Sequence, residues 1–350
     1  MKMKKFNLQN LVRENVKSLH PYASARDEFK EFNADMVFLD ANENPFENGI
    51  NRYPDPQQLS LKEILAKQKG VEASEILLGN GSDEVLDLIF RAFCEPNKDN
   101  IVTLPPTYGM YKVLAATNAI ENREILLSNN FQPQVEQVIQ NVDGQTKLIF
   151  LCSPNNPTAN LFDQDKIVSL LSNFEGLVVI DEAYIDFAET RSWVDRLEEF
   201  PNLIVTQTLS KAYGMAGIRL GICYASEAII GVLNKIKPPY NVNALTQQQA
   251  IERVVDTETL HREINEILES RQNLELQLKQ IDFVKRIYPS DANFILVEVD
   301  DANRRYEELI QKGIVVRNRS SQPLCQNTLR FTIGTLEENK KVVKALNELM

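Results

Sequence analysis

The middle of the chain alternates short apolar runs with amphipathic helical patterns. The spacing of Val85, Ile89 and Phe93 predicts a helix over 83–94 with one apolar face. Five runs, four of them continuously apolar or β-branched, predict strands, as expected for strands buried on both faces. These strands cover 101–104, 147–152, 177–180, 203–206 and 220–224. The alternation predicts an α/β fold with a mainly parallel sheet flanked by helices.

The pattern changes after residue 257, where a smaller α/β unit is predicted. It begins with a long helix that has one polar face, and its last helix begins with the capping box formed by Thr335 and Glu338. The long first helix covers 258–280. Before the last helix come a strand over 293–299, a helix ending near 313, and strands over 314–317 and 329–333. We therefore expect a large domain over 36–255 and a small C-terminal α/β domain over 256–350. Residues 1–35 are expected to form an N-terminal arm that packs with the small domain, with which we group them, or with a partner subunit.

The composition is that of a globular protein with an acidic charge balance. Of the 350 residues, 43% are hydrophobic, and 38 Lys and Arg stand against 49 Asp and Glu, a formal net charge of −11. This balance argues against nucleic acid or an anionic membrane as a partner. No apolar run approaches the ~20 residues that a membrane helix needs. The partners that we expect are small molecules, since a pocket for a small anion needs only a few local cations.

Cysteine and histidine are too sparse for a metal site or a disulfide framework. The four cysteines stand singly, without a CxxC pair, and the two histidines, His20 and His261, are interpreted as structural. The N-terminus is basic but has no apolar segment of the kind found in secretory signals. We expect no bound metal, reduced thiols and a cytoplasmic location.

Polar residues follow the predicted strands at the points where these strands end. Asn156 follows the second strand, Asp181 and Tyr184 follow the third, and Lys211 follows the fourth. In open α/β sheets, ligands bind outside the carboxyl ends of the strands. These side chains are therefore expected to converge on one crevice.

The convergent residues have the chemistry that pyridoxal phosphate requires. Lys211 could hold the aldehyde as a Schiff base and later move a proton. Asp181, fixed by a buried strand, could keep the pyridine nitrogen protonated. Asn156 and Tyr184 could donate hydrogen bonds to the phenolate oxygen of the ring.

The phosphate and the ring face of this cofactor also have candidate partners. The segment Gly81–Ser82–Asp83 offers free N–H groups at a helix N-terminus, where phosphates bind. Ser210 and Arg219 could complete the cradle, with Arg219 as a fork for two phosphate oxygens. Tyr108 could stack on the ring.

The order of the segments GNGSDE, PTYGMY, SPNNPT, DEAY and SKAYGMAGIRLG resembles fold-type I pyridoxal-phosphate aminotransferases, the class II aminotransferases among them. Four further segments resemble the histidinol-phosphate aminotransferase family within that group. They are LDANENP (39–45), NRYPDP (51–56), PPYNVN (238–243) and LRFTIGT (329–335). The resemblance runs from about Pro21 to the C-terminus and so covers nearly the whole chain.

This resemblance implies a fold-type I transferase that moves an amino group between L-histidinol phosphate and 2-oxoglutarate, with glutamate as one product, in L-histidine biosynthesis. It implies catalytic roles for Lys211, Asp181 and Tyr184, and pyridoxal 5'-phosphate as the cofactor. The cofactor-binding residues that it implies are Lys211, Asp181, Asn156, Tyr184, Tyr108, Ser82, Asp83, Thr208, Ser210 and Arg219.

For the substrate, the resemblance implies that Arg330 binds the anionic group with help from Arg317, and it adds Asn42 as a substrate-binding residue. It also implies a homodimer, in which Tyr53 reaches the site of the neighbouring subunit.

Two segments depart from the family pattern. Ala159 stands where the family usually has glycine, and a positive φ at this position would cost about 1 kcal/mol. The segment PYASARDEF replaces a proline-glycine turn near the entrance.

Three alternative functions need to be weighed, of which the two enzymes remain open. An aromatic amino acid aminotransferase and a threonine-phosphate decarboxylase would use the same scaffold, and release of carbon dioxide would identify the decarboxylase. A regulator built on an aminotransferase-like domain would need an appended basic DNA-binding unit. The ~35 residues before the core leave no room for such a unit.

Overall fold

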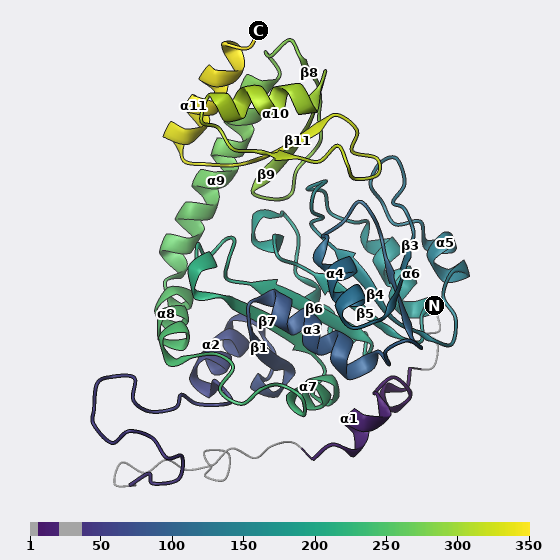
Figure 1. Cartoon of the computed structure of the whole chain (residues 1–350), viewed down its shortest axis with the longest axis vertical. Helices are drawn as coiled ribbons and strands as arrows, with labels where there is room; N and C mark the ends of the chain where they lie inside the picture. The colour runs from purple at the N-terminus through teal and green to yellow at the C-terminus, as the bar shows by residue number, and fades with distance from the viewer. Residues whose placement is uncertain (1–5, 21–36) are drawn as a thin grey trace.

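The computed structural model describes residues 6–20 and 37–350, which are arranged around two β-sheets (Figure 1). The larger sheet has seven strands in the order β1-β7-β6-β5-β4-β2-β3. These strands are Ile76–Asn80 (β1), Asn100–Thr103 (β2), Glu121–Glu124 (β3), Thr146–Cys152 (β4), Leu177–Asp181 (β5), Leu203–Thr208 (β6) and Leu220–Ala225 (β7). The five predicted strands of this region are confirmed as β2, β4, β5, β6 and β7.

The larger sheet is mainly parallel, as predicted. The pairs β2–β3, β2–β4, β4–β5 and β5–β6 are parallel. Strand β7 is antiparallel to both of its neighbours, β6 and β1, so it is the one strand that runs the other way. The carboxyl ends of β4, β5 and β6 therefore meet at one edge.

Helices cover both faces of this sheet because successive strand residues point to opposite sides. Ile149 belongs to a hydrophobic cluster that includes residues of helices α2, α5, α6 and α8, whereas its neighbour Phe150 belongs to one that includes residues of α3, α4 and α7. The helices are Glu14–Ser18 (α1), Leu59–Lys69 (α2), Ser82–Phe93 (α3), Met110–Thr117 (α4), Val135–Gln140 (α5), Gln164–Asn173 (α6), Glu227–Asn234 (α7) and Ala244–Val255 (α8). The helix predicted over 83–94 is confirmed as α3. Short 3-10 helices span Leu8–Asn10, Ala73–Glu75, Ile185–Phe187, Trp193–Arg196 and Ala216–Ile218.

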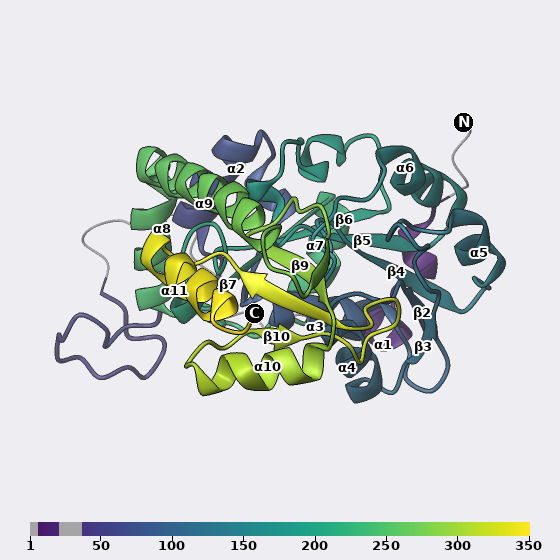
Figure 2. The same cartoon turned by 90° about the horizontal axis from the view of Figure 1, so that it is seen from above.

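The C-terminal unit is a separate layer with its own core. Its four strands are antiparallel in the order β10-β11-β9-β8, and α9 leads into it from α8 beside the larger sheet (Figures 1 and 2). Its elements are Thr257–Leu278 (α9), Val284–Ile287 (β8), Phe294–Val299 (β9), Ala302–Gln311 (α10), Arg317–Asn318 (β10), Thr328–Thr332 (β11) and Leu336–Asn347 (α11). The predicted capping box at Thr335 and Glu338 is present. The strand predicted over 314–317 is observed as β10, which has only two residues and begins at Arg317, because pairing with β11 begins there.

The described part of the N-terminal segment packs on the larger sheet unit. Leu11, Val12 and Val16 are buried in the same cluster as the apolar face of α3, and Arg13 bonds to Glu95 after that helix. For residues 6–20 this differs from the expected association with the small domain. The physical reason is that their apolar side chains are covered by α3 and its neighbours. The division at 255/256 falls between α8 and α9 and stays a prediction.

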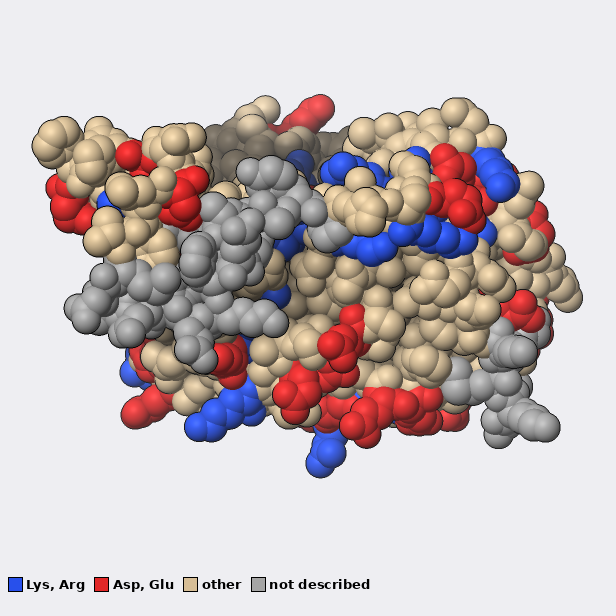
Figure 3. Space-filling model, turned by 90° about the horizontal axis from the view of Figure 1, so that it is seen from below, with Lys and Arg blue, Asp and Glu red and all other residues tan. Residues whose placement is uncertain are grey.

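Charge is mixed on the surface. In the view of Figure 3, acidic side chains gather along one edge and basic side chains form a narrow band, and no broad basic surface is seen on this face. None of the helices in the described part of the chain has the length and apolarity that a membrane-spanning helix requires.

Candidate active site

A pocket lies where β4, β5 and β6 end, as expected for an open α/β sheet. Cys152 is the last residue of β4, Asp181 of β5 and Thr208 of β6, and all three line this pocket. All ten predicted cofactor-binding residues line it, together with Cys152 and Ala183. Loops after the strands and the start of α3 thus bring together residues that are up to 137 positions apart, from Ser82 to Arg219.

The Asp181 carboxylate is buried, and a tyrosine of helix α4 holds it by a hydrogen bond. Its Oδ2 accepts a 2.7 Å hydrogen bond from the Tyr111 hydroxyl, and its Oδ1 accepts a 3.3 Å bond from the Ala183 N–H. Burial raises the pKa of Asp181, and the bond from Tyr111 opposes that rise. Burial also raises the pKa of Tyr111 well above its ordinary value, so its hydroxyl stays protonated and donates.

Lys211 lies across the pocket in the loop after β6. Its Nζ is 5.6 Å from the centre of the Tyr184 ring. Desolvation lowers the pKa of Lys211, and the nearby charge of Arg330 lowers it further. The neutral amine, which is the form that can act as nucleophile or base, is therefore favoured more than in a free lysine.

The N-terminus of α3 and the loop after β6 form a polar cradle. Gly81, with φ +84°, precedes α3, and a Cβ there would lie 2.6 Å from a guanidinium nitrogen of Arg219. A Cβ at Gly221 would lie 2.3 Å from the Ser82 nitrogen, so β7 approaches the helix start closely. The Thr208 hydroxyl lies 3.0 Å from the Ser210 hydroxyl. N–H groups and hydroxyls therefore converge at one end of the pocket.

Asp83 connects the cradle with Tyr108. The Tyr108 hydroxyl donates a 3.1 Å bond to Asp83 Oδ1, while Arg219 lies 3.8 Å from Asp83 Oδ2. Burial, followed by the Asp83 charge, raises the pKa of Tyr108. Tyr108 is therefore a neutral aromatic ring held at the side of the pocket.

Arg330 reaches this pocket from the smaller sheet. It donates a 2.5 Å bond to Asn156 Oδ1, and the Asn156 amide in turn lies 3.5 Å from the Tyr184 hydroxyl. Its guanidinium lies 5.1 Å from the centre of the Phe294 ring. Burial, followed by the charge of Arg319, lowers the pKa of Arg330 to about 10. The two sheets thus meet at the side chains that the sequence assigned to cofactor and substrate.

Two of the predicted substrate residues lie apart from this pocket. Asn42 and Tyr53 line a separate surface pocket with Arg52 and Asn243, and Tyr53 stacks on Tyr240 with 4.5 Å between ring centres. The fourth predicted residue, Arg317, lies in β10 directly opposite Arg330.

Comparison with known proteins shows the family to which this chain belongs. The sequence profile described as Aminotransferase class I and II matches residues 29–346. A histidinol-phosphate aminotransferase of Flavobacterium johnsoniae is 66% identical over 348 residues, which cover 99% of this chain and 100% of that protein. The chain belongs to the class I and II aminotransferase family.

Solved structures share the fold of this aminotransferase. The histidinol-phosphate aminotransferase of Clostridium acetobutylicum matches with a TM-score of 0.80 at 24% identity, covering 86% of this chain and 91% of that one. The enzyme of Sinorhizobium meliloti, solved in complex with pyridoxal-5'-phosphate, matches with a TM-score of 0.78 at 23% identity, covering 85% and 84%.

The cofactor of class I and II aminotransferases is pyridoxal phosphate, and the donors of the pocket fit it. A buried carboxylate suits a protonated pyridine nitrogen, and Lys211 suits an aldehyde. The first turn of α3 has no side-chain cap at Gly81, so its N–H groups are available to a phosphate. No cluster of three or more metal-binding side chains occurs within 6–20 and 37–350.

Sequence reasoning missed two residues that act on side chains of this site without lining the pocket. Tyr111 is fully buried and touches Asp181, but only its position one helical turn after Tyr108 could have indicated it. Arg319 is the charged group with the largest effect on the pKa of Arg330, and it follows the predicted strand 314–317.

Of the two departures from the family pattern, one lies within the described residues. Ala159 is fully buried with φ +66°, so the left-handed conformation considered for this position is present. The segment 21–29, which contains PYASARDEF, lies outside the described residues.

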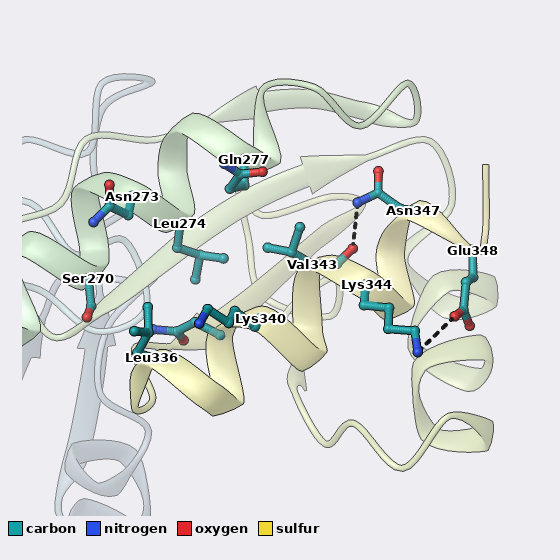
Figure 4. A pocket seen from close by; sticks show the side chains of 11 residues that line it. Ser270, Asn273, Leu274, Gln277, Leu336, Lys340, Val343, Lys344, Asn347 and Glu348 are labelled. Atoms are coloured by element: carbon teal, nitrogen blue, oxygen red, sulfur yellow. Dashed lines mark hydrogen bonds and ion pairs between the residues drawn. The ribbon is translucent and has the colours of Figure 1, made fainter.

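A second hollow lies between α9 and α11, away from this chemistry (Figure 4). Leu274, Leu336 and Val343 contribute its apolar surface, and the ion pair drawn there joins Lys344 and Glu348 at 4.0 Å. None of the predicted site residues lines this hollow, so the candidate active site is the pocket at the strand ends.

Proposed function

We propose that this chain catalyses reversible amino transfer between L-histidinol phosphate and 2-oxoglutarate, giving imidazole acetol phosphate and L-glutamate, in L-histidine biosynthesis. The observation that carries this proposal is one pocket that contains Lys211 and Asp181 while Arg330 reaches it from the smaller sheet. The similarity of the whole chain to the Flavobacterium johnsoniae enzyme supports the same substrate.

Pyridoxal phosphate, when bound, supplies an aldehyde carbon for the amine and a ring that accepts electrons from the substrate α-carbon. In our proposal Asp181 holds a proton on the ring nitrogen. Asn156 and Tyr184 donate to the ring oxygen, and Tyr108 stacks on the ring. The fixed partners of Asp181 and Tyr108 support these roles, since neither side chain has to reorganise during the reaction.

Lys211 is the proposed base. Its neutral amine would accept the proton that leaves the substrate α-carbon and, once protonated, would be the group that gives this proton back. The lowered pKa of Lys211 supports this role because a larger fraction of the amine is neutral near pH 7.

The phosphate of the cofactor is proposed to lie at the N-terminus of α3. Ser82, Thr208, Ser210 and Arg219 supply donors there. Asp83 contributes its backbone N–H, while its carboxylate holds Arg219 and Tyr108 in place. This division of roles avoids placing an unpaired carboxylate against the phosphate.

Arg330, with Arg317 opposite it, is proposed to bind the anionic end of the substrate. We further propose a homodimer in which Tyr53 and Asn42 serve the site of the neighbouring subunit. Exposed apolar side chains on the same segment, including Phe46 at 79% exposure, support burial against a second copy. A cytoplasmic location is proposed because all four cysteines are free and buried.

The test is one half reaction, followed by the absorption of the bound cofactor in the purified holoenzyme. L-histidinol phosphate should convert the aldehyde form to the amine form rapidly, and 2-oxoglutarate should reverse the change. Conversion only with tyrosine or phenylalanine would instead identify an aromatic amino acid aminotransferase. Release of carbon dioxide from threonine phosphate would identify a decarboxylase, and either result would overturn the proposal.

A further inference from the structure

Buried polar atoms without partners are concentrated in the chain segment that ends at Arg330. Within residues 6–20 and 37–350, nine buried side-chain nitrogen or oxygen atoms have no hydrogen-bond partner. Four of them belong to residues 319–330, namely Arg319 Nε, Ser320 Oγ, Gln322 Oε1 and Arg330 Nε. Each such group costs about 1–3 kcal/mol unless water or a ligand satisfies it, so the segment 319–330 has polar atoms that no protein group satisfies.

Three of the arginines here share one face of the smaller sheet. Arg317 lies directly opposite Arg330, and the Arg319 N–H donates a 2.9 Å bond to the Thr328 carbonyl, so the pairing of the two chains continues. Residues two positions apart in an extended chain point to the same side. Arg317, Arg319 and Arg330 therefore lie on one face, and Arg330 contacts Asn156 from it.

These three positive charges have no acidic partner. Among the described residues, no carboxylate lies within 4.0 Å of Arg317, Arg319 or Arg330, whereas Arg305 in the same unit pairs with Asp300 at 2.8 Å. Like charges opposite each other on a sheet are destabilising. Burial, followed by the charge of Arg317, lowers the pKa of Arg319. The cluster is thus arranged to receive negative charge from outside the protein.

We propose that Arg319 is a specificity-determining residue, which adds a third cation for the substrate and selects a phosphate monoester dianion over a carboxylate. The inference rests on the proposed function and names the residue that gives it phosphate specificity. One guanidinium satisfies a carboxylate with two parallel bonds. A phosphate dianion has three terminal oxygens and twice the charge, so it gains most from further guanidinium donors.

The experiment compares Arg319→Gln with the wild-type holoenzyme on two amines, L-histidinol phosphate and L-histidinol, which lacks the phosphate. Loss of a charge-assisted contact should lower kcat/KM for L-histidinol phosphate by roughly 10- to 100-fold, mainly through KM. The values for L-histidinol and for 2-oxoglutarate should change by less than about threefold. Arg319→Lys should recover part of the loss, because it restores the charge without the fork.

Arg286→Gln is the matched control. Arg286 is an exposed arginine of β8 in the same sheet, with its guanidinium 4.4 Å from the centre of the Tyr288 ring. This variant should leave all three kinetic values unchanged. Equal losses with both amines in Arg319→Gln would indicate a structural role for Arg319 and would overturn the inference, as would unchanged kinetics with L-histidinol phosphate.

Inhibition by inorganic phosphate separates this inference from the proposed function. The inhibition constant should rise by roughly tenfold or more in Arg319→Gln. If the wild-type enzyme converted only aromatic amino acids, the proposed function would fail, yet a raised inhibition constant would still support Arg319 as an anion-binding residue. An inhibition constant equal to that of the wild type would overturn the inference whichever amine is converted.

Discussion

The two sides of the site satisfy their charges in opposite ways: one side, called here the wall of the larger sheet, contains Asp181, and the other, called the wall of the smaller sheet, contains Arg330. On the wall formed by the larger sheet, Asp181 accepts a hydrogen bond from Tyr111, and Asp83 has both Tyr108 and Arg219 beside it. On the wall formed by the smaller sheet, Arg319 and Arg330 have no acidic partner among the described residues, and both keep an unpartnered buried Nε.

This difference matches what each wall is proposed to bind. The cofactor stays with the enzyme, so internal partners can fix Asp181 in one orientation and one charge state before each turnover. Substrate and product exchange in every cycle, so the positive charges opposite remain available. The walls also differ in structure. The larger sheet is mainly parallel and covered on both faces, whereas Arg330 lies in β11 and Arg319 follows the edge strand β10 of a four-stranded antiparallel sheet.

Replacing Lys211 should have the largest effect, because no other lysine lines the pocket in the described chain. Lys211→Ala should lower turnover by roughly 10²- to 10⁴-fold or more through loss of the proton-transferring amine. Cofactor should still bind through the cradle, with the absorption of a free aldehyde. Turnover within tenfold of the wild type would contradict the assignment of Lys211.

Asp181→Ala should have the next largest effect. Removing the carboxylate should lower turnover by roughly 10²- to 10³-fold, because the charge that favours a protonated ring nitrogen is lost. Circular dichroism should show an intact fold, since the side chain lies at the end of β5 rather than within a packed helix. Near wild-type turnover would rule out the proposed role of Asp181.

Tyr111→Phe is a smaller change on the wall of the larger sheet, because it removes only the hydrogen bond that Tyr111 donates to Asp181. It removes the hydroxyl but keeps a ring that stacks on Phe150, 4.9 Å away. Without the donated bond, the pKa of Asp181 should rise further above its ordinary value. The acidic limb of the rate-against-pH profile should therefore move to higher pH, with kcat/KM roughly tenfold lower.

Tyr224→Phe is the matched control for Tyr111. Tyr224 is equally buried, but its hydroxyl has no hydrogen-bond partner. Its loss should leave the pH profile in place. A similar shift in both variants would mean that the effect comes from burial and not from the bond to Asp181.

Most strands with continuous apolar sequence were predicted, whereas the edge strands β1, β3 and β8 were missed. Buried strands such as β4 and β5 need apolar residues on both faces, which leaves a clear signal. Strand β3 lies at the sheet edge with the sequence ENRE, and β8 has the sequence VKRI, in which two charged residues interrupt the apolar ones, so neither has such a signal. Their pairing depends on neighbours that are distant in the sequence.

The candidate site divides in a similar way. Residues that follow predicted strands, such as Asp181 and Lys211, could be placed at one crevice because strand ends meet at one edge. Tyr111 could not, because its role depends on how α4 packs across β5. Arg319 could not either, because its side of the sheet follows from pairing that begins at Arg317, where the predicted strand ends.

Ala159→Gly should have the smallest effect and tests the backbone next to the site. Ala159 has φ +66° and packs in the same cluster as Tyr184. Glycine would relieve about 1 kcal/mol of left-handed strain. It would also remove a buried methyl group worth about 0.8 kcal/mol. The two terms nearly cancel, so the midpoint of thermal unfolding should stay within about 1 °C of the wild type.

Ala119→Gly provides the matched comparison, because Ala119 has φ +55° but is exposed. Its methyl group contributes little packing, so only the strain term remains, and the unfolding midpoint should rise by roughly 1–3 °C. An equal rise in both variants would show that the Ala159 methyl contributes nothing to the cluster around Tyr184. A fall of the unfolding midpoint by several degrees in Ala159→Gly alone would show that packing of the methyl group outweighs the backbone strain. Ala159 would then help to hold Tyr184 in place on the wall of the larger sheet.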